Sequence, residues 1–225
     1  MKIYLFLLIS PFLILSQITS GDSSPISTDL GLDLSYIKRE LSMPYKPNNT
    51  SIDGNKYYFK KPYNATLLLV KNNTPINVVT NYNLLEQTFD ILDNEEPLKL
   101  LPDRIKKVIF PETEFISINN KFYEVIEEND NFSLLADTYL EIYFPSYTPG
   151  IQDKPDPVFR KRNSVFLYHK NKFNYVERRK SFLISMFDRE MAKEISLYIK
   201  KNKISPRSND ELKTLFLEFH THINN

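Results

Sequence analysis

The middle of the chain alternates short apolar runs with polar turn residues. Five runs follow one another between residues 104 and 144: RIKKVIF, EFISIN, KFYEVIE, FSLLAD and YLEIYF. Aromatic and β-branched residues dominate these runs, and such residues favour strands over helices. Asn, Asp or Pro lies in most of the gaps, where these residues form tight turns. Short strands at close and fairly even intervals are typical of an antiparallel sheet or barrel.

Residues 75–101, PINVVTNYNLLEQTFDILDNEEPLKLL, fit two different periods. One face of a helix would carry the positions spaced three and four apart: Leu84, Leu85, Thr88, Phe89 and Leu92. In a strand, Leu85, Phe89 and Ile91 would share the inward face. The neighbouring runs, and the turn-like DNEEP at residues 93–97, favour the second period. The sequence therefore predicts strands here, joined by a hairpin loop.

The first twenty residues have the pattern of a secretory signal peptide. Met1 and Lys2 give a short positive start, residues 3–15 (IYLFLLISPFLIL) are apolar, and the polar SQITSGDSS follows. This apolar run is shorter than the about 20 residues that a membrane-spanning helix needs. We predict a signal peptide at residues 1–20, with an uncleaved anchor as the alternative, and a loosely ordered lead-in at residues 21–55. The mature chain is then expected in the periplasm or outside the cell, without a transmembrane helix.

The end of the chain has helical periodicity. In residues 181–203 one apolar stripe is formed by Leu183, Phe187, Met191, Ile195, Tyr198 and Ile199. In an alternative interpretation, Asp188 caps a second helical segment after a break. Pro206 precedes a last helix, whose start carries the capping-box pair Ser208 and Glu211. We expect the helices to form an antiparallel hairpin that packs on the sheet.

These patterns together predict an α+β fold. Its body, at residues 56–177, is an antiparallel β-meander or partly open barrel, and a C-terminal helical hairpin follows at residues 178–225. Within the body, the sequence SYTPGIQDKPDP at residues 146–157 is rich in Pro and predicts a loop without regular structure. Residues 163–177, NSVFLYHKNKFNYVE, predict a hairpin that turns at HKNK.

Composition limits how the chain is stabilised and what it binds. Only 4 Gly are present among 225 residues, so Asn and Asp must supply the turn positions with positive φ. The absence of Cys excludes disulfides and a lipid-acceptor cysteine. The net charge of +1 hides an asymmetry, because residues 158–225 hold 15 Lys and Arg against 7 Asp and Glu, or +8, and the remainder carries −7. This asymmetry indicates an anionic partner or two parts of the protein that attract each other.

Few patterns point to a cofactor or a metal. The glycines are isolated, so the sequence has no glycine-rich phosphate loop. His169 lies in the predicted hairpin turn, where we expect it to be exposed to solvent. His220 and His222 would lie about 200° apart on a helix, which prevents both from binding one ion. We therefore expect no cofactor and no metal.

Paired acids leave an enzymatic alternative open. Glu112 and Glu114 are two residues apart, so a strand would carry both carboxyls on one face. Two carboxyl groups that flank a glycosidic bond are the usual apparatus of glycoside hydrolysis. A glycan-directed secreted hydrolase is the alternative function, and a shared cleft for the two acids would support it.

The predicted hairpin at residues 163–177 is flanked by the basic clusters FRKRNS and VERRKS. Aromatic residues lie between the clusters, a combination that suits stacking of nucleic-acid bases beside a charged backbone. The candidate binding residues are Arg160, Arg162, Tyr168, Tyr175, Arg178 and Arg179. We expect a non-enzymatic exported envelope protein, a scaffold or binding module. Its partner would be an anionic glycan, a lipid headgroup or another envelope protein, and export argues against nucleic acid.

Several motifs give the chain a resemblance to a known family. They are Tyr82-Asn83 at a strand opening, the I-K-x-V-x-F strand at residues 105–110, KFYEVIEEND-FSLL at residues 121–135, the tyrosine-bearing hairpin at residues 164–183, YIKKNKI at residues 198–204 and DEL at residues 210–212. In this order of elements the chain resembles a family of uncharacterised exported proteins of flavobacteria and relatives. The resemblance implies export and strands across residues 75–101, and it implies no known activity.

Overall fold

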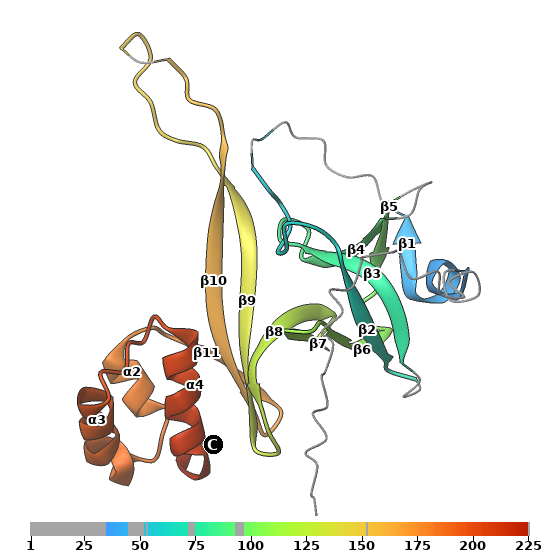
Figure 1. Cartoon of the computed structure of the whole chain (residues 1–225). Helices are drawn as coiled ribbons and strands as arrows, with labels where there is room; N and C mark the ends of the chain where they lie inside the picture. The colour runs from blue at the N-terminus through green and yellow to red at the C-terminus, as the bar shows by residue number, and fades with distance from the viewer. Residues whose placement is uncertain are drawn as a thin grey trace, which may run out of the picture.

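A computed structural model describes residues 35–44, 52, 54–71, 75–92, 97–151 and 153–224. Within these residues, eleven strands form one open antiparallel sheet in the order β1-β5-β4-β3-β2-β6-β7-β8-β9-β10-β11. Helices follow at the C-terminal end of the chain (Figure 1). The predicted α+β fold, an antiparallel sheet followed by a helical segment, is confirmed.

The structure gives the bounds of the elements in chain order. The strands are β1 (Ser42–Pro44), β2 (Tyr63–Leu69), β3 (Ile76–Asn83), β4 (Thr88–Leu92), β5 (Pro97–Leu100), β6 (Ile105–Ile109), β7 (Glu114–Ile118), β8 (Lys121–Glu128), β9 (Phe132–Tyr143), β10 (Val158–His169) and β11 (Lys172–Val176). The helices are the π-helix η1 (Ile37–Leu41), α2 (Lys180–Ser185), the 3₁₀ turn η2 (Arg189–Met191), α3 (Ala192–Lys201), α4 (Asn209–Glu218) and the 3₁₀ turn η3 (His220–His222).

The predicted signal peptide lies outside the described residues, as does most of the expected lead-in. The described part of the lead-in supplies η1 and β1, and it buries Ile37 and Leu41 in the core. In the part of the chain that the structure describes, we find no helix with the length and apolar character needed to cross a membrane.

The described residues of the range 75–101 contain the strands β3, β4 and β5, as the neighbouring runs predicted. The helical interpretation fails at Asn83, whose side-chain carbonyl accepts hydrogen bonds from the N–H groups of Leu85 and Glu86, both at 3.1 Å. These bonds close a turn at residues 84–87, and Gln87 ends it with a φ of 54°. The chain therefore reverses between β3 and β4 instead of continuing as a helix. Strands β4 and β5 also pair antiparallel, although the loop at residues 93–96 lies outside the described residues.

The N-terminal half of the sheet curves around an aromatic core (Figure 1). The backbone N–H of Leu140 on β9 donates to the carbonyl of Leu84, 2.9 Å away, so the turn after β3 touches the edge of β9. The largest enclosed side chains are the rings of Tyr82, Phe89, Phe110, Phe115 and Phe122. Packing of these rings holds the curved strands together without disulfides.

One interpretation of the central strands needs correction. The runs FSLLAD and YLEIYF form one strand, β9, and not two. Asp137, which the sequence suggested as a break, is buried within it and accepts hydrogen bonds from Lys121 at 2.6 Å and from Gln87 at 3.1 Å. An ion pair and an amide thus allow a carboxylate to stay in a buried strand position.

Asn supplies turns of positive φ, as the shortage of Gly predicted. Asn119 and Asn120, with φ of 51° and 60°, join β7 to β8. Lys170 and Asn171, with φ of 48° and 61°, join β10 to β11 and confirm the predicted hairpin. Two successive residues of positive φ form the type I′ turn, whose twist matches that of the strands.

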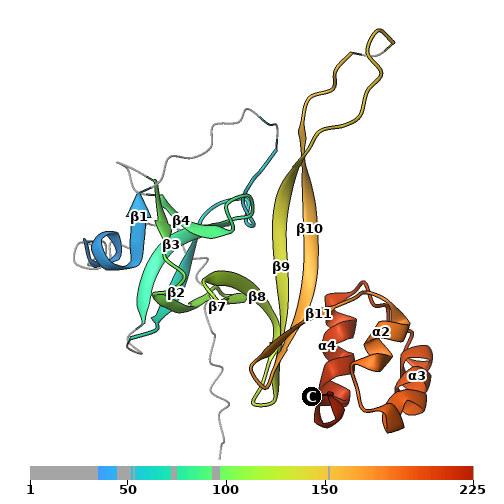
Figure 2. The same ribbon diagram turned by 180° about the vertical axis from the view of Figure 1, so that it is seen from behind.

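The helices pack against β9, β10 and β11 and form a second core (Figures 1 and 2). Leu134, Val165, Leu167 and Val176 contribute from the strands. The single stripe expected for residues 181–203 is interrupted by a break near Asp188, as in the alternative interpretation, but the Asp188 side chain does not cap the segment that follows. The cause is tertiary, because residues 186–188 bond to the C-terminal segment: Asp188 N–H donates to the His222 carbonyl at 2.8 Å.

Ser208 caps α4, as the sequence predicted. Its hydroxyl accepts from the Glu211 N–H at 3.3 Å, while the Glu211 carboxylate accepts from the N–H of Ser205 and not from that of Ser208. We expect Ser208→Ala to lower the free energy of unfolding by about 1 kcal/mol, because one helix N–H loses its acceptor. Urea denaturation followed by circular dichroism measures this change. A Ser185→Ala variant, at an exposed position, is the control, and equal losses in both would contradict a capping role.

Candidate functional site

The alternation of β10 and β11 places four of the six predicted binding residues on one face of the sheet. Arg160, Arg162 and Tyr168 follow one another with even spacing on β10, and Tyr175 lies opposite Phe166. Val165 and Leu167, at the odd positions of β10, belong to the helix-covered core. The four residues therefore lie on the face turned away from the helices, which we call the outer face.

Ring packing and pairing occupy much of the outer face. Phe173 lies 4.7 Å from Phe166 and 5.0 Å from the buried Tyr123 between ring centroids, so Phe166 and Phe173 are half-buried. The Arg160 guanidinium stacks on the ring of Tyr143 at 3.5 Å. Arg162 donates to Glu141 at 2.8 Å. The two arginines are thus engaged by their strand neighbours and do not converge with Arg178 and Arg179.

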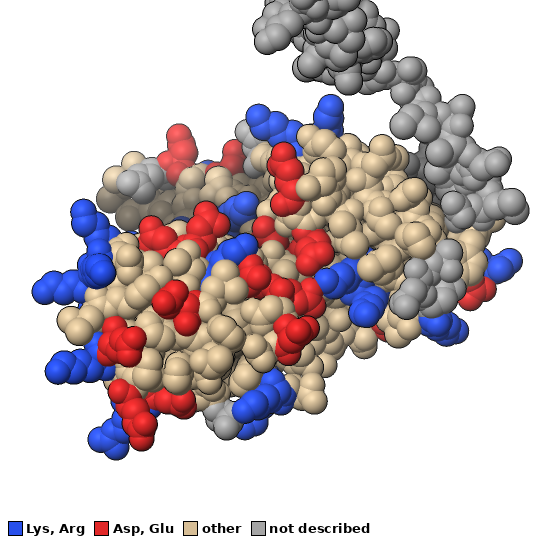
Figure 3. All heavy atoms as spheres, turned by 60° about the horizontal axis from the view of Figure 1, so that its bottom comes forward, with Lys and Arg blue, Asp and Glu red and all other residues tan. Residues whose placement is uncertain are grey.

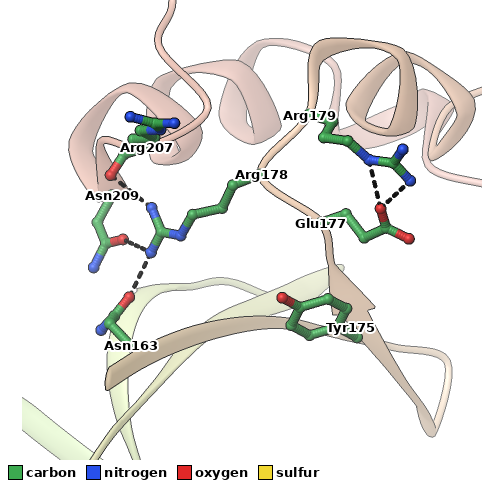
Figure 4. A pocket seen from close by; sticks show the side chains of 7 residues that line it. All are labelled: Asn163, Tyr175, Glu177, Arg178, Arg179, Arg207 and Asn209. Atoms are coloured by element: carbon green, nitrogen blue, oxygen red, sulfur yellow. Dashed lines mark hydrogen bonds and ion pairs between the residues drawn. The ribbon is translucent and has the colours of Figure 1, made fainter. Parts of the chain in front are cut away.

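The two remaining predicted residues, Arg178 and Arg179, line a shallow, open hollow of about 840 Å³ together with Tyr175 of the edge strand β11. Its lining consists of Asn163, Tyr175, Glu177, Arg178, Arg179, Arg207 and Asn209 (Figure 4). We call it the arginine hollow. It combines Tyr175, Arg178 and Arg179, which the sequence suggested, with residues from the connection between α3 and α4. Those additions were missed, because residues 207 and 209 are distant in sequence from the basic hairpin.

Arg178 is held in the hollow by four oxygen atoms. Its Nη1 donates to the main-chain carbonyls of Pro206 at 3.3 Å and Arg207 at 2.6 Å. Its Nη2 donates to the side-chain carbonyl of Asn209 at 2.8 Å and to that of Asn163. Figure 4 shows the guanidinium between Arg207, Asn209 and Asn163. All four acceptors are neutral, so these contacts fix the position of the charge without cancelling it.

The local charge of the hollow is positive. Partial burial lowers the pKa of the Arg178 guanidinium, which still remains cationic at neutral pH. Arg179 pairs with Glu177, through an Nε–Oε2 contact of 2.7 Å, on the far side of the hollow in Figure 4. Arg207 is exposed. The lining of the hollow thus contains three guanidinium groups and one carboxylate. Tyr175, which is 51% exposed, adds an aromatic surface.

A second hollow, of about 470 Å³, adjoins the first through Asn209, which lines both. It contains three carboxyl groups, those of Glu112, Glu124 and Asp210, together with Tyr58. We call it the acidic hollow. The Tyr58 hydroxyl donates to Glu124 at 2.6 Å. Burial raises the pKa of Glu124, while this hydrogen bond and the charge of Lys161 act in the opposite direction.

The acid pair suggested by the sequence does not share this hollow. Glu112 lines it, whereas Glu114 at the start of β7 contacts Lys107 at 3.3 Å, and Lys107 also pairs with Glu128. Glu124 takes the place expected for Glu114. Its position in the run KFYEVIE gave no signal, because the partner Tyr58 lies 66 residues earlier in the chain.

Glu124 gives a testable dependence of stability on pH. Its pKa in the folded state is raised above the usual 4.5, so the folded protein holds this proton more tightly than the unfolded chain. The stabilisation is complete below the unfolded pKa and is lost as the pH rises through the folded pKa. From about pH 4 to about pH 8, we expect the free energy of unfolding of the native chain to fall relative to that of Glu124→Gln.

Urea midpoints measured across this range test the expectation. The side-chain amide introduced by Glu124→Gln keeps an acceptor for the Tyr58 hydroxyl, so the variant removes the ionisation and retains the hydrogen bond. Glu112→Gln changes an exposed carboxyl of the same hollow and is the matched control. Parallel curves for the native chain and Glu124→Gln would show that Glu124 titrates normally.

Ion pairs connect the basic and acidic parts of the chain. Arg162 contacts Glu141, and Lys213 on α4 contacts Glu127 on β8 at 2.7 Å. On the face shown in Figure 3, acidic side chains lie across the middle and basic ones project mainly from the edges. Both ion pairs support mutual attraction between the two parts as one origin of the charge asymmetry in the sequence.

The histidines differ in their surroundings, and one expectation was wrong. His169 is the last residue of β10 and is buried, where its Nδ1–H donates to the Asn131 carbonyl at 2.7 Å. The turn begins only at the next residue, which explains the error. His222 lies 3.4 Å from Asp188, and His220 contacts the Leu217 carbonyl. Among the described residues there is no group of three His, Asp or Glu side chains placed to hold a metal ion.

None of the described residues of the proline-rich loop, 146–151 and 153–157, is in the lining of the arginine hollow. Comparisons of the chain with protein-family models, with curated proteins and with solved structures find no match. The resemblance to exported flavobacterial proteins therefore stays a prediction from the sequence.

Proposed function

We propose that the protein is a non-enzymatic binding module that holds an anionic group in the arginine hollow. The observation that carries this proposal is the Arg178 guanidinium, fixed by four neutral oxygen atoms beside Arg179 and Arg207. A cation that is already immobilised loses little conformational entropy when a ligand arrives. An anion is the partner that such a positively charged hollow attracts.

The arginines of the hollow have different roles in the proposed binding. A guanidinium has five N–H donors, and Arg178 uses both of its terminal nitrogens within the protein. Arg178 therefore supplies charge and rigidity. Arg207 is exposed, and its guanidinium can donate two parallel hydrogen bonds to a phosphate, sulfate or carboxylate. Arg179 would add a second charged contact to the anion once its ion pair with Glu177 is broken.

The proposed setting is the bacterial envelope, in the periplasm or outside the cell. Support comes from the signal-peptide pattern at residues 1–20 and from the family resemblance. In that setting the anionic group belongs to a glycan, a lipid headgroup or another envelope protein. The absence of Cys from the sequence means that the fold is held together without disulfides.

Titration calorimetry with dextran sulfate, and with neutral dextran as the control ligand, tests the proposal. We expect dextran sulfate alone to bind, with an affinity that falls as salt is added. Arg207→Ala should weaken binding about tenfold, the effect of losing one charged contact. Arg189→Ala removes an exposed arginine outside the hollow and should leave binding unchanged. Equal losses in the two variants would mean that only the overall charge matters, and the proposal would fail.

A second candidate function rests on the acidic hollow. Glu112 and Glu124 line it together, and burial raises the pKa of Glu124, as a general acid of a glycosidase requires. A glycan-directed hydrolase would then use Glu124 as the acid and Glu112 as the base or nucleophile. Release of nitrophenol from a panel of aryl glycosides tests this alternative. Activity that disappears in Glu124→Gln would favour it, and an inactive native chain would reject it.

A further inference from the structure

The longest hairpin of the sheet ends in an arm that extends beyond the rest of the described protein (Figures 1 and 2). Strands β9 and β10 pair as far as Tyr143 and Val158. Beyond this pair, residues 144–151 and 153–157 are irregular and form the arm. The Ile151 N–H donates to the Thr148 carbonyl at 3.1 Å, and Gly150 has a φ of 82°. Pro149 and Gly150 thus occupy the central positions of a type II turn at the apex.

Apolar side chains are exposed along this arm. Ile151 is 80% exposed, Phe144 69% and Tyr147 39%. Tyr147 and Ile151 flank the apical turn, and Phe144 lies closer to the strands. Exposure of large apolar side chains to water is unfavourable, and a group of them at the end of a projection indicates a contact surface.

The backbone of the arm is suited to a region of low water content. Four of its residues are proline: Pro145, Pro149, Pro155 and Pro157. Proline has no N–H group, so each removes a donor that would otherwise lose its hydrogen bond to water. The irregular backbone still carries carbonyls and other N–H groups. It is therefore compatible with the hydrated interface of a bilayer and not with its hydrocarbon centre.

We propose that the apex of this arm inserts into the interface of a lipid bilayer. Tyr147 and Ile151 would enter first, with Phe144 at the level of the headgroups, where aromatic side chains are favoured. Asp153 and Asp156 on the returning limb limit the depth. These carboxylates offset the nearby Lys154 and Arg160, so apolar contact and not charge drives attachment. The attachment is weak and reversible, because few side chains are buried.

The absence of Trp from the sequence allows a direct test. Ile151→Trp places a single fluorescent reporter at the apex, and Leu197→Trp places one at an exposed position of α3, 59% exposed, as the matched control. With vesicles of phosphatidylcholine, we expect Ile151→Trp emission to shift to shorter wavelength and to be quenched by brominated acyl chains. The Leu197→Trp emission should not change. Equal parts of phosphatidylcholine and phosphatidylglycerol should give a similar shift that persists in high salt.

Vesicle sedimentation of chains without Trp gives an independent measurement. The double variant Tyr147→Ser and Ile151→Ser should bind vesicles about tenfold less than the native chain, while Leu197→Ser should bind equally well. Unchanged Ile151→Trp emission on both vesicles would overturn the proposal. So would a shift seen only with phosphatidylglycerol and abolished by salt, or one that rises with protein concentration without vesicles, which would indicate docking to a second copy. Dextran sulfate binding and its dependence on Arg207 are unaffected by any of these outcomes.

Discussion

Phe89→Ala should lower the free energy of unfolding by about 3–5 kcal/mol, the largest loss that we expect from a single substitution. Phe89 is fully buried on β4. Its ring centroid lies 4.9 Å from Tyr82, 5.1 Å from Phe115, 4.9 Å from Phe122 and 5.9 Å from Phe110. Truncation leaves a cavity that these large, closely packed rings cannot fill by small movements.

Urea denaturation followed by circular dichroism measures the loss. Val79→Ala, on the neighbouring strand β3 and 46% exposed, is the control and should change the unfolding free energy by about 0.5 kcal/mol or less. Since domains of this size are stabilised by only about 5–15 kcal/mol, Phe89→Ala removes a large share of the total. A loss below about 1 kcal/mol in Phe89→Ala would show that the curved strands do not enclose a well-packed core.

Residues 75–101 show how far local patterns determine this fold. The positions from Leu84 to Leu92 fit a helix, yet Leu84 and Leu85 lie in a turn and Phe89 in a strand. The surrounding runs predicted the strands correctly, because a helix at this point would have interrupted a continuous antiparallel sheet. Propensity is a weak prior that tertiary context overrides.

The contacts between distant segments could not be predicted in the same way. A break in the stripe at residues 181–203 was only an alternative, since its cause is the bond between Asp188 and His222 near the end of the chain. The buried state of Asp137 depends on Lys121 and Gln87. Each side chain is ordinary in its local sequence. Only the folded arrangement brings the partners together.

The candidate site likewise contains residues that the strand period places and residues that only tertiary packing places. Strand period alone places Arg160, Arg162, Tyr168 and Tyr175 on one face. The arginine hollow also needs α4 to begin beside the end of β11, and this position depends on the packing of the second core. The basic hairpin was predictable from the sequence. Asn209 was not, because it lies 31 residues after Arg178 and comes close to it only in the folded chain.

Arg178→Ala should lower the free energy of unfolding by about 2–3 kcal/mol, a large effect for a residue that is only partly buried. The substitution removes four hydrogen bonds that join the hairpin of β10 and β11 to the connection between α3 and α4. Water reaches the exposed side of the hollow and recovers part of this loss, which keeps the effect below that of Phe89→Ala. Hydrogen exchange should quicken at residues 207–211, where α4 begins.

Arg178→Lys and Arg207→Ala separate structure from binding. Lysine keeps the charge but has one donor nitrogen in place of the planar fork, so it cannot reach all four acceptors and should lose more than half of the stabilisation. Arg207→Ala should change stability by about 0.5 kcal/mol or less, because the side chain is exposed and its contact to Arg178 is made by the main chain. If Arg178→Lys were as stable as the native chain, the positive charge and not the four hydrogen bonds of the planar guanidinium would join the hairpin to the connection between α3 and α4. If Arg207→Ala were as unstable as Arg178→Ala, its weaker binding of dextran sulfate would reflect a damaged hollow and not a lost contact.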